Sequence, residues 1–236
     1  MNRLQVIRQQ EKEYHDHCYE HYKLFQAGTW MHKPVQTVLE MYRMLESQPE
    51  LQILDLGCGV GRNSIPLAQG LQHRAGKVVC VDLLESAIAK LYDYANEYGA
   101  AQHIDGIVSD IGSFAIERNA YDFIVAVSSL EHLASEEQFD RVLLSMIEGT
   151  KDEGIHCFII STNISETLLE SGEQIDPMYE LNFSTDSLTS KLQHYYADWK
   201  LLKHTIKPYH TEIAREGRQI LLKGDVVTWA VQKQQS

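Results

Sequence analysis

Several features that mark particular protein classes are missing from this sequence of 236 residues. It has only four cysteines, at positions 18, 58, 80 and 157, and none of them form the short paired spacing of a zinc site or a disulfide framework. No apolar run is long enough to cross a bilayer, and the first residues, MNRLQVIRQQEKEY, lack the apolar stretch of a signal peptide. We therefore expect a protein of the reducing cytoplasm, without a metal site and without a membrane partner.

Basic residues are also scarce. Lys and Arg number 21 against 33 Asp and Glu, which gives a formal net charge of -12. A protein that binds nucleic acid through its phosphates needs a basic face, so this balance argues against general nucleic-acid binding. Hydrophobic residues make up 44% of the chain, which is the composition of an ordinary folded protein. A chain of this length can bury one substantial core, and we expect one globular unit.

Helical and strand patterns alternate along most of the chain, which predicts an α/β fold with parallel strands joined by helices. Apolar runs typical of strands covered on both faces occur at 51–56, 77–82, 104–109, 121–127 and 154–160. Helical patterns occur at about 4–26, from Pro34 to 48, and at about 62–70, 85–98, 135–148 and 186–196. After residue 161 this regular alternation loosens, and a polar stretch leads into the last of these helices. Two further strands, near 199–207 and 225–231, are expected to pair as an antiparallel edge.

The most informative stretch is ILDLGCGVGRNS, residues 53–64. It places Gly57, Gly59 and Gly61 directly after an apolar strand and before a helix. Glycine lets the backbone adopt positive φ and approach a ligand closely, and a helix N-terminus offers free N–H groups. The loop also follows the carboxyl end of a strand, which is where open α/β sheets bind their ligands. The sequence therefore predicts a nucleotide site here.

Two common kinds of nucleotide loop do not fit this stretch. A Walker-type phosphate loop ends in Gly-Lys-Ser or Gly-Lys-Thr, and that motif is absent. A dinucleotide loop beginning at Gly57 requires a third glycine at position 62, where this chain has Arg62. That third glycine permits close packing of helix against strand, so a nicotinamide-dependent dehydrogenase is disfavoured.

Three carboxylates accompany the successive strand ends. Asp55 lies two residues before the glycine loop, where a carboxylate suits a cationic ammonium group better than a pyrophosphate. Asp82 ends the second strand of this series, VVCVD, where it can accept hydrogen bonds from both ribose hydroxyls. Asp110 ends the third, IVSDIG, where it can accept an amino proton of adenine while the N–H of Ile111 meets a ring nitrogen.

Taken in order, the motifs DLGCGVG, VVCVD, VSDIG and YDFIVAVSSLEHL resemble those of class I S-adenosylmethionine-dependent methyltransferases. The resemblance covers about residues 50–160 and extends weakly to the last strands. It implies a Rossmann-like fold, a doubly wound and mostly parallel seven-stranded sheet with an antiparallel C-terminal edge. It also implies an N-terminal helical lid at 1–48 ahead of a cofactor-binding domain at 49–236. The C-terminal third is loosely similar to the tellurite-resistance group of this family.

By position, the resemblance implies S-adenosylmethionine as the cofactor and assigns residues to each part of it. The methionine part would be surrounded by Asp55, Gly57, Cys58, Gly59 and Gly61, the ribose by Asp82 and Leu83, and the adenine by Asp110 and Ile111. Ser128, after the fourth strand, would lie near the cofactor and the reacting centre.

Methyl transfer needs a nucleophile in line behind the methyl group, and a base helps when that nucleophile carries a proton. His132, in SSLEHL after the fourth strand, is the candidate base, because a neutral imidazole can accept a proton near neutral pH. Its neighbour Glu131 is expected to be solvated. Segments before the first motif often cover the cofactor in this family, which makes Tyr14 and Trp30 candidate lid residues. Tyr179 is a candidate for the acceptor pocket.

The resulting interpretation is a methyltransferase that acts on a small-molecule acceptor through an O, N or other nucleophile. The acidic balance and the short N-terminal extension both favour a small, diffusible acceptor. The alternative is a non-catalytic protein of the same fold that binds the cofactor or a protein partner and transfers nothing. Product formation over a panel of acceptors separates the two.

Overall fold

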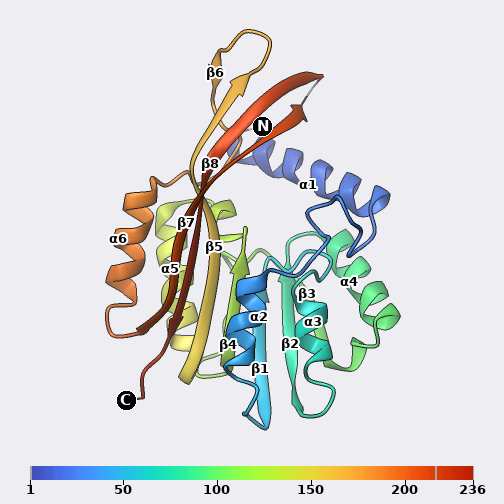
Figure 1. Cartoon of the computed structure of the whole chain (residues 1–236), viewed down its shortest axis with the longest axis vertical. Coiled ribbons are helices and arrows are strands. Elements are labelled where there is room, and N and C mark those ends of the chain that lie inside the picture. The colour runs from blue at the N-terminus through green and yellow to red at the C-terminus, as the bar shows by residue number, and fades with distance from the viewer. Residues whose placement is uncertain (1, 216, 236) are drawn as a thin grey trace.

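In the computed structural model, residues 2–215 and 217–235 are described. Within them the chain forms one eight-stranded sheet in the order β3-β2-β1-β4-β5-β8-β7, with β6 paired to β5 (Figure 1). The parallel strands are β1 (Glu50–Leu56), β2 (Ala75–Asp82), β3 (Ile104–Val108), β4 (Tyr121–Val127) and β5 (Thr150–Leu168). The antiparallel part consists of β6 (Gln174–Ile175), β7 (Lys200–Arg215) and β8 (Arg218–Gln232). The expected mostly parallel sheet with an antiparallel C-terminal edge is confirmed.

Helices cover both faces of this sheet. One face packs against α2 (Gln36–Arg43), α3 (Ser64–Gln69) and α4 (Glu85–Glu97), and the other against α5 (Glu136–Gly149) and α6 (Thr185–Tyr195). Two 3-10 turns, η1 (Ala101–His103) and η2 (Leu130–His132), follow α4 and β4. Along β1, Ile53 belongs to the first core and Leu54 and Leu56 to the second, because successive strand residues point to opposite faces. The sheet is therefore doubly wound.

Helix α5 illustrates how local sequence sets these elements. Its N-terminus is capped by Ser135, whose hydroxyl accepts the N–H of Gln138 at 3.2 Å. Phe139, Leu143 and Met146 then follow at helical spacing and are fully buried against the sheet. The helix starts within one residue of the position that the sequence predicts.

One strand is longer than the sequence predicts: β5 does not end at residue 160. Strand β5 continues to Leu168 and pairs with β8 up to Ile220, after a register shift between Thr162 and Ser165. The pattern was hidden because one of the inward positions carries a charge. Glu166 is fully buried and is held by two hydrogen bonds from Arg215, at 2.6 and 2.9 Å. With β6 and the longer ends of β7 and β8, this extension forms an arm beyond the sheet (Figure 1).

Helix α1 (Arg3–His21) lies across the carboxyl end of the parallel strands, beside this arm (Figure 1). Polar contacts hold it at three places along its length. Arg3 bonds to Asp176 at 3.0 Å near the arm, Arg8 bonds to Asp110 after β3, and Asp16 accepts the hydroxyl of Ser86 on α4. No helix in the described part of the chain is both long and apolar enough to span a bilayer.

Candidate functional site

The loop between β1 and α3 is built on glycines that no other residue could replace without strain. Gly57, Gly59 and Gly61 have φ of +77°, +53° and +96°. A Cβ atom on Gly57 would overlap the Cβ of Ser129, which lies just after β4. A Cβ on Gly61 would lie 2.6 Å from the Cδ1 of Leu91. The loop is thus packed tightly between the ends of β1 and β4 and helix α4. Its backbone, without side chains, is free to approach a ligand closely.

Asp82 braces this loop from the end of β2. Its Oδ2 accepts the N–H of Gly59 at 2.8 Å, and its Oδ1 accepts the N–H of Leu84 at 2.9 Å. Burial raises the pKa of Asp82, while the hydrogen bonds from Leu84 and Gly59 oppose that shift. The side chain of Leu83 is exposed beside it. Asp82 therefore has a structural role that the sequence did not reveal, and its contact with a ribose stays a prediction.

Asp55 lies under the loop rather than at its surface. Its carboxylate is 1% exposed and accepts the hydroxyl of Ser64, the first residue of α3, at 2.5 Å. Burial raises the pKa of Asp55 to about 6, against the hydrogen bond of Ser64 and the positive charge of Arg62. The position ties β1 to the start of α3. A direct contact of Asp55 with a ligand's ammonium group stays a prediction.

Asp110 closes the same edge of the sheet after β3. Its Oδ1 accepts the N–H of Gly112 at 2.8 Å, which fixes the turn that carries Ile111. Its Oδ2 is bonded to Nη2 of Arg8 at 2.9 Å. Arg8 lies on the inner face of α1, and its Nε is buried without a hydrogen-bond partner among the described residues. Sequence reasoning missed Arg8, because it searched α1 for apolar and aromatic residues only.

Aromatic residues from the N-terminal segment cover the glycine loop. The hydroxyl of Tyr19 lies 3.1 Å from the place of a Cβ on Gly59. The ring of Trp30 lies 6.4 Å from that of Tyr19, and the guanidinium of Arg62 lies 5.4 Å from the Trp30 ring centroid. Trp30 therefore lies beside the glycine loop, and its role as a lid residue stays a prediction. Tyr14 is half exposed, and the burial of part of its side chain raises its pKa, with smaller contributions from Cys18 and Glu11.

The loop after β4 faces the glycine loop. Ser128 has a positive φ of 51° and donates its N–H to the carbonyl of Ile159 on β5, at 2.8 Å. The buried hydroxyl of Ser129 donates to the carbonyl of Leu56 at 2.7 Å, which fastens this loop to β1. Ser129 was not singled out from the sequence, since its role appears only once Gly57 is seen against it. The turn η2, which holds Glu131 and His132, follows directly.

His132 is fixed in an ion pair. Its Nδ1 lies 2.9 Å from Oε2 of Glu180, and its ring stacks on Tyr179 with centroids 5.7 Å apart. Burial disfavours the imidazolium, but the hydrogen bond of Glu180 and the charges of Glu11 and Glu131 outweigh it and raise the pKa of His132 to about 9. A pKa of about 9 favours the imidazolium at neutral pH and argues against the expected neutral imidazole base, whose role stays a prediction. Tyr179 thus contacts His132, and its place in an acceptor pocket stays a prediction.

Glu131 also differs from the sequence expectation, because it is buried and not solvated. The residue is 1% exposed, and its Oε1 accepts the N–H of Ser161 on β5 at 3.0 Å. Its Oε2 is buried and has no hydrogen-bond partner within residues 2–215 and 217–235. Burial raises the pKa of Glu131, with the charge of His132 opposing. A buried carboxylate oxygen without a partner is costly, so a water molecule or a ligand group that donates a hydrogen bond would be stabilised at this point.

Three side chains of α1 itself also carry buried polar atoms without partners among the described residues: Nε of Arg8, Oε1 of Gln10 and Nδ1 of His15. Together with the cradle of positive-φ glycines, these atoms fit a ligand that carries both charged and hydrogen-bonding groups. No group of three or more His, Cys, Asp or Glu side chains able to hold a metal ion occurs among the described residues.

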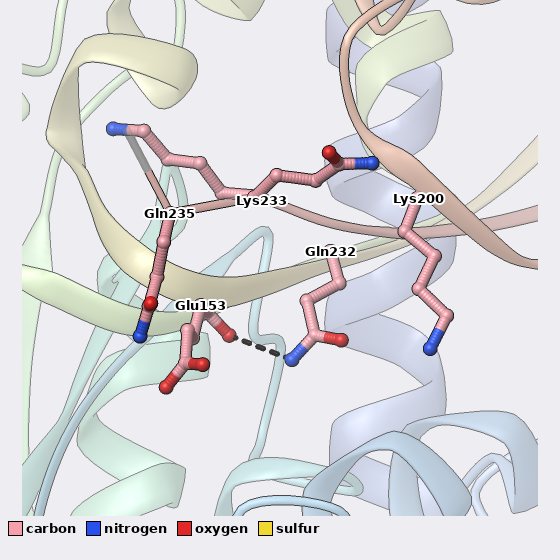
Figure 2. Close-up of a pocket in the computed structure, with 6 residues that line it drawn as sticks. Glu153, Lys200, Gln232, Lys233 and Gln235 are labelled. Atoms are coloured by element: carbon pink, nitrogen blue, oxygen red, sulfur yellow. Dashed lines mark hydrogen bonds between the residues drawn. The ribbon is translucent and has the colours of Figure 1, made fainter.

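A separate surface depression lies at the opposite end of the sheet. It is lined by residues at the start of β5 and β7 and at the end of β8, among them Glu153, Lys200, Gln232 and Lys233 (Figure 2). The amide of Gln232 donates to the carbonyl of Glu153 at 3.0 Å. Because it lies at the amino end of β5, this depression does not belong to the site at the glycine loop.

Comparison with known proteins agrees with this geometry. Residues 53–154 match the family model described as a methyltransferase domain. A ubiquinone biosynthesis O-methyltransferase of Rickettsia canadensis is 32% identical over 115 residues, which are 48% of this chain and 43% of that protein. A carboxy-S-adenosyl-L-methionine synthase of Shewanella baltica is 27% identical over 128 residues, 52% of this chain and 51% of that protein. The chain thus matches about half the length of these relatives or less.

Solved structures of other proteins share this fold. TehB from Haemophilus influenzae superimposes with a TM-score of 0.63 at 22% identity, over 93% of this chain and 67% of TehB. An S-adenosylmethionine-dependent methyltransferase from Clostridium acetobutylicum gives a TM-score of 0.61 at 14% identity, over 94% of this chain and 99% of that protein. At such identities the likeness shows the fold.

Proposed function

Because the chain belongs to the class I S-adenosylmethionine-dependent methyltransferases, we propose that it transfers the methyl group of S-adenosylmethionine to a small-molecule acceptor. One observation carries this proposal. The glycine cradle at 57–61 meets the carboxyl ends of β1, β2 and β4, and the buried, unpartnered oxygen of Glu131 lies two residues beyond the serine that touches it. The glycine loop proposed to hold the cofactor therefore contacts the segment that carries Glu131, a residue with a buried carboxylate oxygen that lacks a hydrogen-bond partner.

The residues present fit the cofactor. Asp82 and Leu83 at the end of β2 would hold the ribose, and Asp110 and Ile111 after β3 would hold the adenine. The glycine loop and Ser128 would surround the methionine part, with Asp55 acting from below through Ser64. When bound, the sulfonium of the cofactor supplies an electrophilic methyl group. The chain's own contribution is to orient the acceptor against it and to exclude water, which α1 and the aromatic residues over the loop support.

A small acceptor suits the charge of the chain. The formal net charge of -12 disfavours a nucleic-acid phosphate backbone as a general partner. In addition, α1 and the segment around Tyr179 narrow the approach to the end of β4. The cytoplasm remains our proposed location, which is supported by four cysteines that are all buried and free.

Thermal unfolding with candidate cofactors tests this proposal. S-adenosylmethionine, S-adenosylhomocysteine and a nicotinamide cofactor are added separately at equal concentration. A ligand at one hundred times its Kd adds about 2.7 kcal/mol, which raises the midpoint by roughly 5–10 °C for a chain of this size. We expect a shift with the first two only. Formation of S-adenosylhomocysteine over a panel of acceptors then separates the enzyme from a non-catalytic cofactor-binding protein, which would give the shift without the product.

A further inference from the structure

Glu131 is surrounded by charged and phenolic side chains from several elements. His132 adjoins it on η2, and the ring of Tyr179, in the segment before α6, stacks on His132 with centroids 5.7 Å apart. Burial raises the pKa values of Tyr179 and of Tyr209 on β7, and the negative charge of Glu131 adds to both shifts. Glu11 reaches the same group from α1, since it acts on both His132 and Tyr179. We call these five residues the acceptor cluster: Glu11, Glu131, His132, Tyr179 and Tyr209.

The charges around this cluster leave a negative excess. Glu180 is paired with the imidazolium of His132 at 2.9 Å, and Glu166 is paired with Arg215 through two hydrogen bonds. Both of these acids are therefore compensated. Glu11 contacts His15 at 3.4 Å, and its pKa is lowered because that histidine, His132 and Arg215 outweigh the effect of burial.

Glu131 is different, because its Oε2 has no hydrogen-bond partner within the described protein, and the nearby charge of His132 is the main influence that opposes the effect of burial on its pKa. Its backbone is fixed as well as its side chain: its carbonyl accepts the N–H of Leu181 at 3.0 Å, while Oε1 accepts the N–H of Ser161. The free oxygen is consequently held in place and buried. Tyrosine rings beside a buried carboxylate offer a cation both charge and a π face.

From this arrangement we propose that the acceptor is a small primary or secondary amine, whose ammonium group binds the free carboxylate oxygen of Glu131 beside the rings of Tyr179 and Tyr209. The inference rests on the proposed methyl transfer and names its substrate class. A carboxylate acceptor would be repelled by Glu11 and Glu131. A neutral hydroxyl could donate to Glu131 but would leave the negative charge of the cluster uncompensated.

The carboxylate of Glu131 can also accept the proton that the ammonium group of the acceptor must lose before methyl transfer. An ammonium nitrogen has no lone pair, so one N–H proton passes to Oε2 of Glu131 before transfer. The freed nitrogen lone pair then forms a bond to the methyl carbon, the carbon–sulfur bond breaks, and its electron pair remains on sulfur as a neutral thioether. The product is the methylated ammonium ion, and Glu131 returns its proton to water. His132 cannot take this part, because it is already protonated and bonded to Glu180.

Binding of three matched probes tests the proposal. 2-Phenylethylamine, 2-phenylethanol and phenylacetate share a skeleton and differ in their polar group. Each is titrated calorimetrically into the full chain saturated with S-adenosylhomocysteine. We expect the amine to bind at least tenfold more tightly than the alcohol and the acid not to bind. Equal binding of amine and alcohol, preference for the acid, or no binding of the amine at 10 mM would each overturn the proposal.

Two variants test whether Glu131 is the residue that binds the amine. Glu131→Gln keeps the shape of the side chain and is expected to weaken amine binding at least tenfold, with the Kd of S-adenosylmethionine changed by less than twofold. Glu20→Gln, on the exposed side of α1, removes the same charge away from the cluster and should leave amine binding unchanged. If Glu131→Gln proves unfolded by circular dichroism, the wild-type probe series still decides the question. Failure of the wild type to bind S-adenosylmethionine refutes the proposed function itself, whereas cofactor binding without amine preference refutes only the amine.

Discussion

Arg8 and Asp110 form an ion pair of 2.9 Å between the N-terminal helix and the end of β3, across 102 positions of sequence. Asp110 is the carboxylate expected to receive the adenine amino group. Both side chains are about one quarter to one third exposed, so solvent screens the pair and its contribution to stability is small. Its importance is positional, because it holds α1 over the edge of the sheet where the cofactor is expected.

Arg8→Ala is therefore expected to loosen the cover over the site. Loss of a partly exposed pair is worth up to about 1 kcal/mol, which corresponds to roughly a fivefold faster dissociation of S-adenosylmethionine. Stopped-flow displacement measures that rate. Arg141→Ala, on the exposed face of α5, serves as the matched control and should leave the rate unchanged. A dissociation rate in Arg8→Ala equal to that of the wild type would show that α1 does not retain the cofactor.

Asp82→Ala should impair cofactor binding more severely. The substitution removes the acceptor of the Gly59 and Leu84 N–H groups together with the predicted ribose contact. Hydrogen bonds to a charged group are worth about 1.5–3 kcal/mol, so we expect Kd to rise roughly 10- to 100-fold. Titration calorimetry measures it, and circular dichroism checks that the fold persists. An unchanged Kd in a folded variant would refute the placement of the ribose at Asp82.

The sheet and the glycine loop could be predicted because their signals are local. Apolar runs mark the parallel strands, and the loop demands glycine for reasons of backbone conformation that are written directly into residues 57–61. Even so, the sequence did not show that Ser129 stands against Gly57. That contact joins positions 72 residues apart, and a serine after a strand is not a sequence signal for such a contact.

What the sequence concealed are charges that became buried. Glu166 lies on an inward position of β5 and is neutralised by Arg215, so the continuation of this strand beyond residue 160 was not recognised. Glu131 was expected to be solvated for the same reason, since charged residues are normally exposed, and it is 1% exposed. Their burial depends on partners brought from distant elements, which single-sequence patterns do not contain.

Gly57→Ala tests the close approach of the two loops. At φ of +77° an alanine costs about 1–2 kcal/mol, and its Cβ would also overlap that of Ser129, adding roughly 1–3 kcal/mol. Gly28→Ala is the matched control, because Gly28 has a φ of +83° with nothing within 4 Å of an added Cβ. Urea denaturation should show Gly57→Ala losing clearly more stability than Gly28→Ala. Equal losses would mean that only the backbone conformation matters and that the two loops do not touch.

The protonation of His132 gives a pH dependence whose sign is fixed. Its pKa of about 9 lies above the ordinary value of 6.5, so the ion pair with Glu180 contributes stability that is fully present below pH 6.5 and is lost as the pH rises through 9. In Glu180→Gln the pKa of His132 should fall towards 6.5. The stability difference between wild type and variant should then shrink between pH 6.5 and 9. Following the imidazole resonances by NMR measures both titrations. A wild-type midpoint near 6.5 would restore the neutral histidine and with it a general-base role for His132, leaving Glu131 without its distinct part in the reaction.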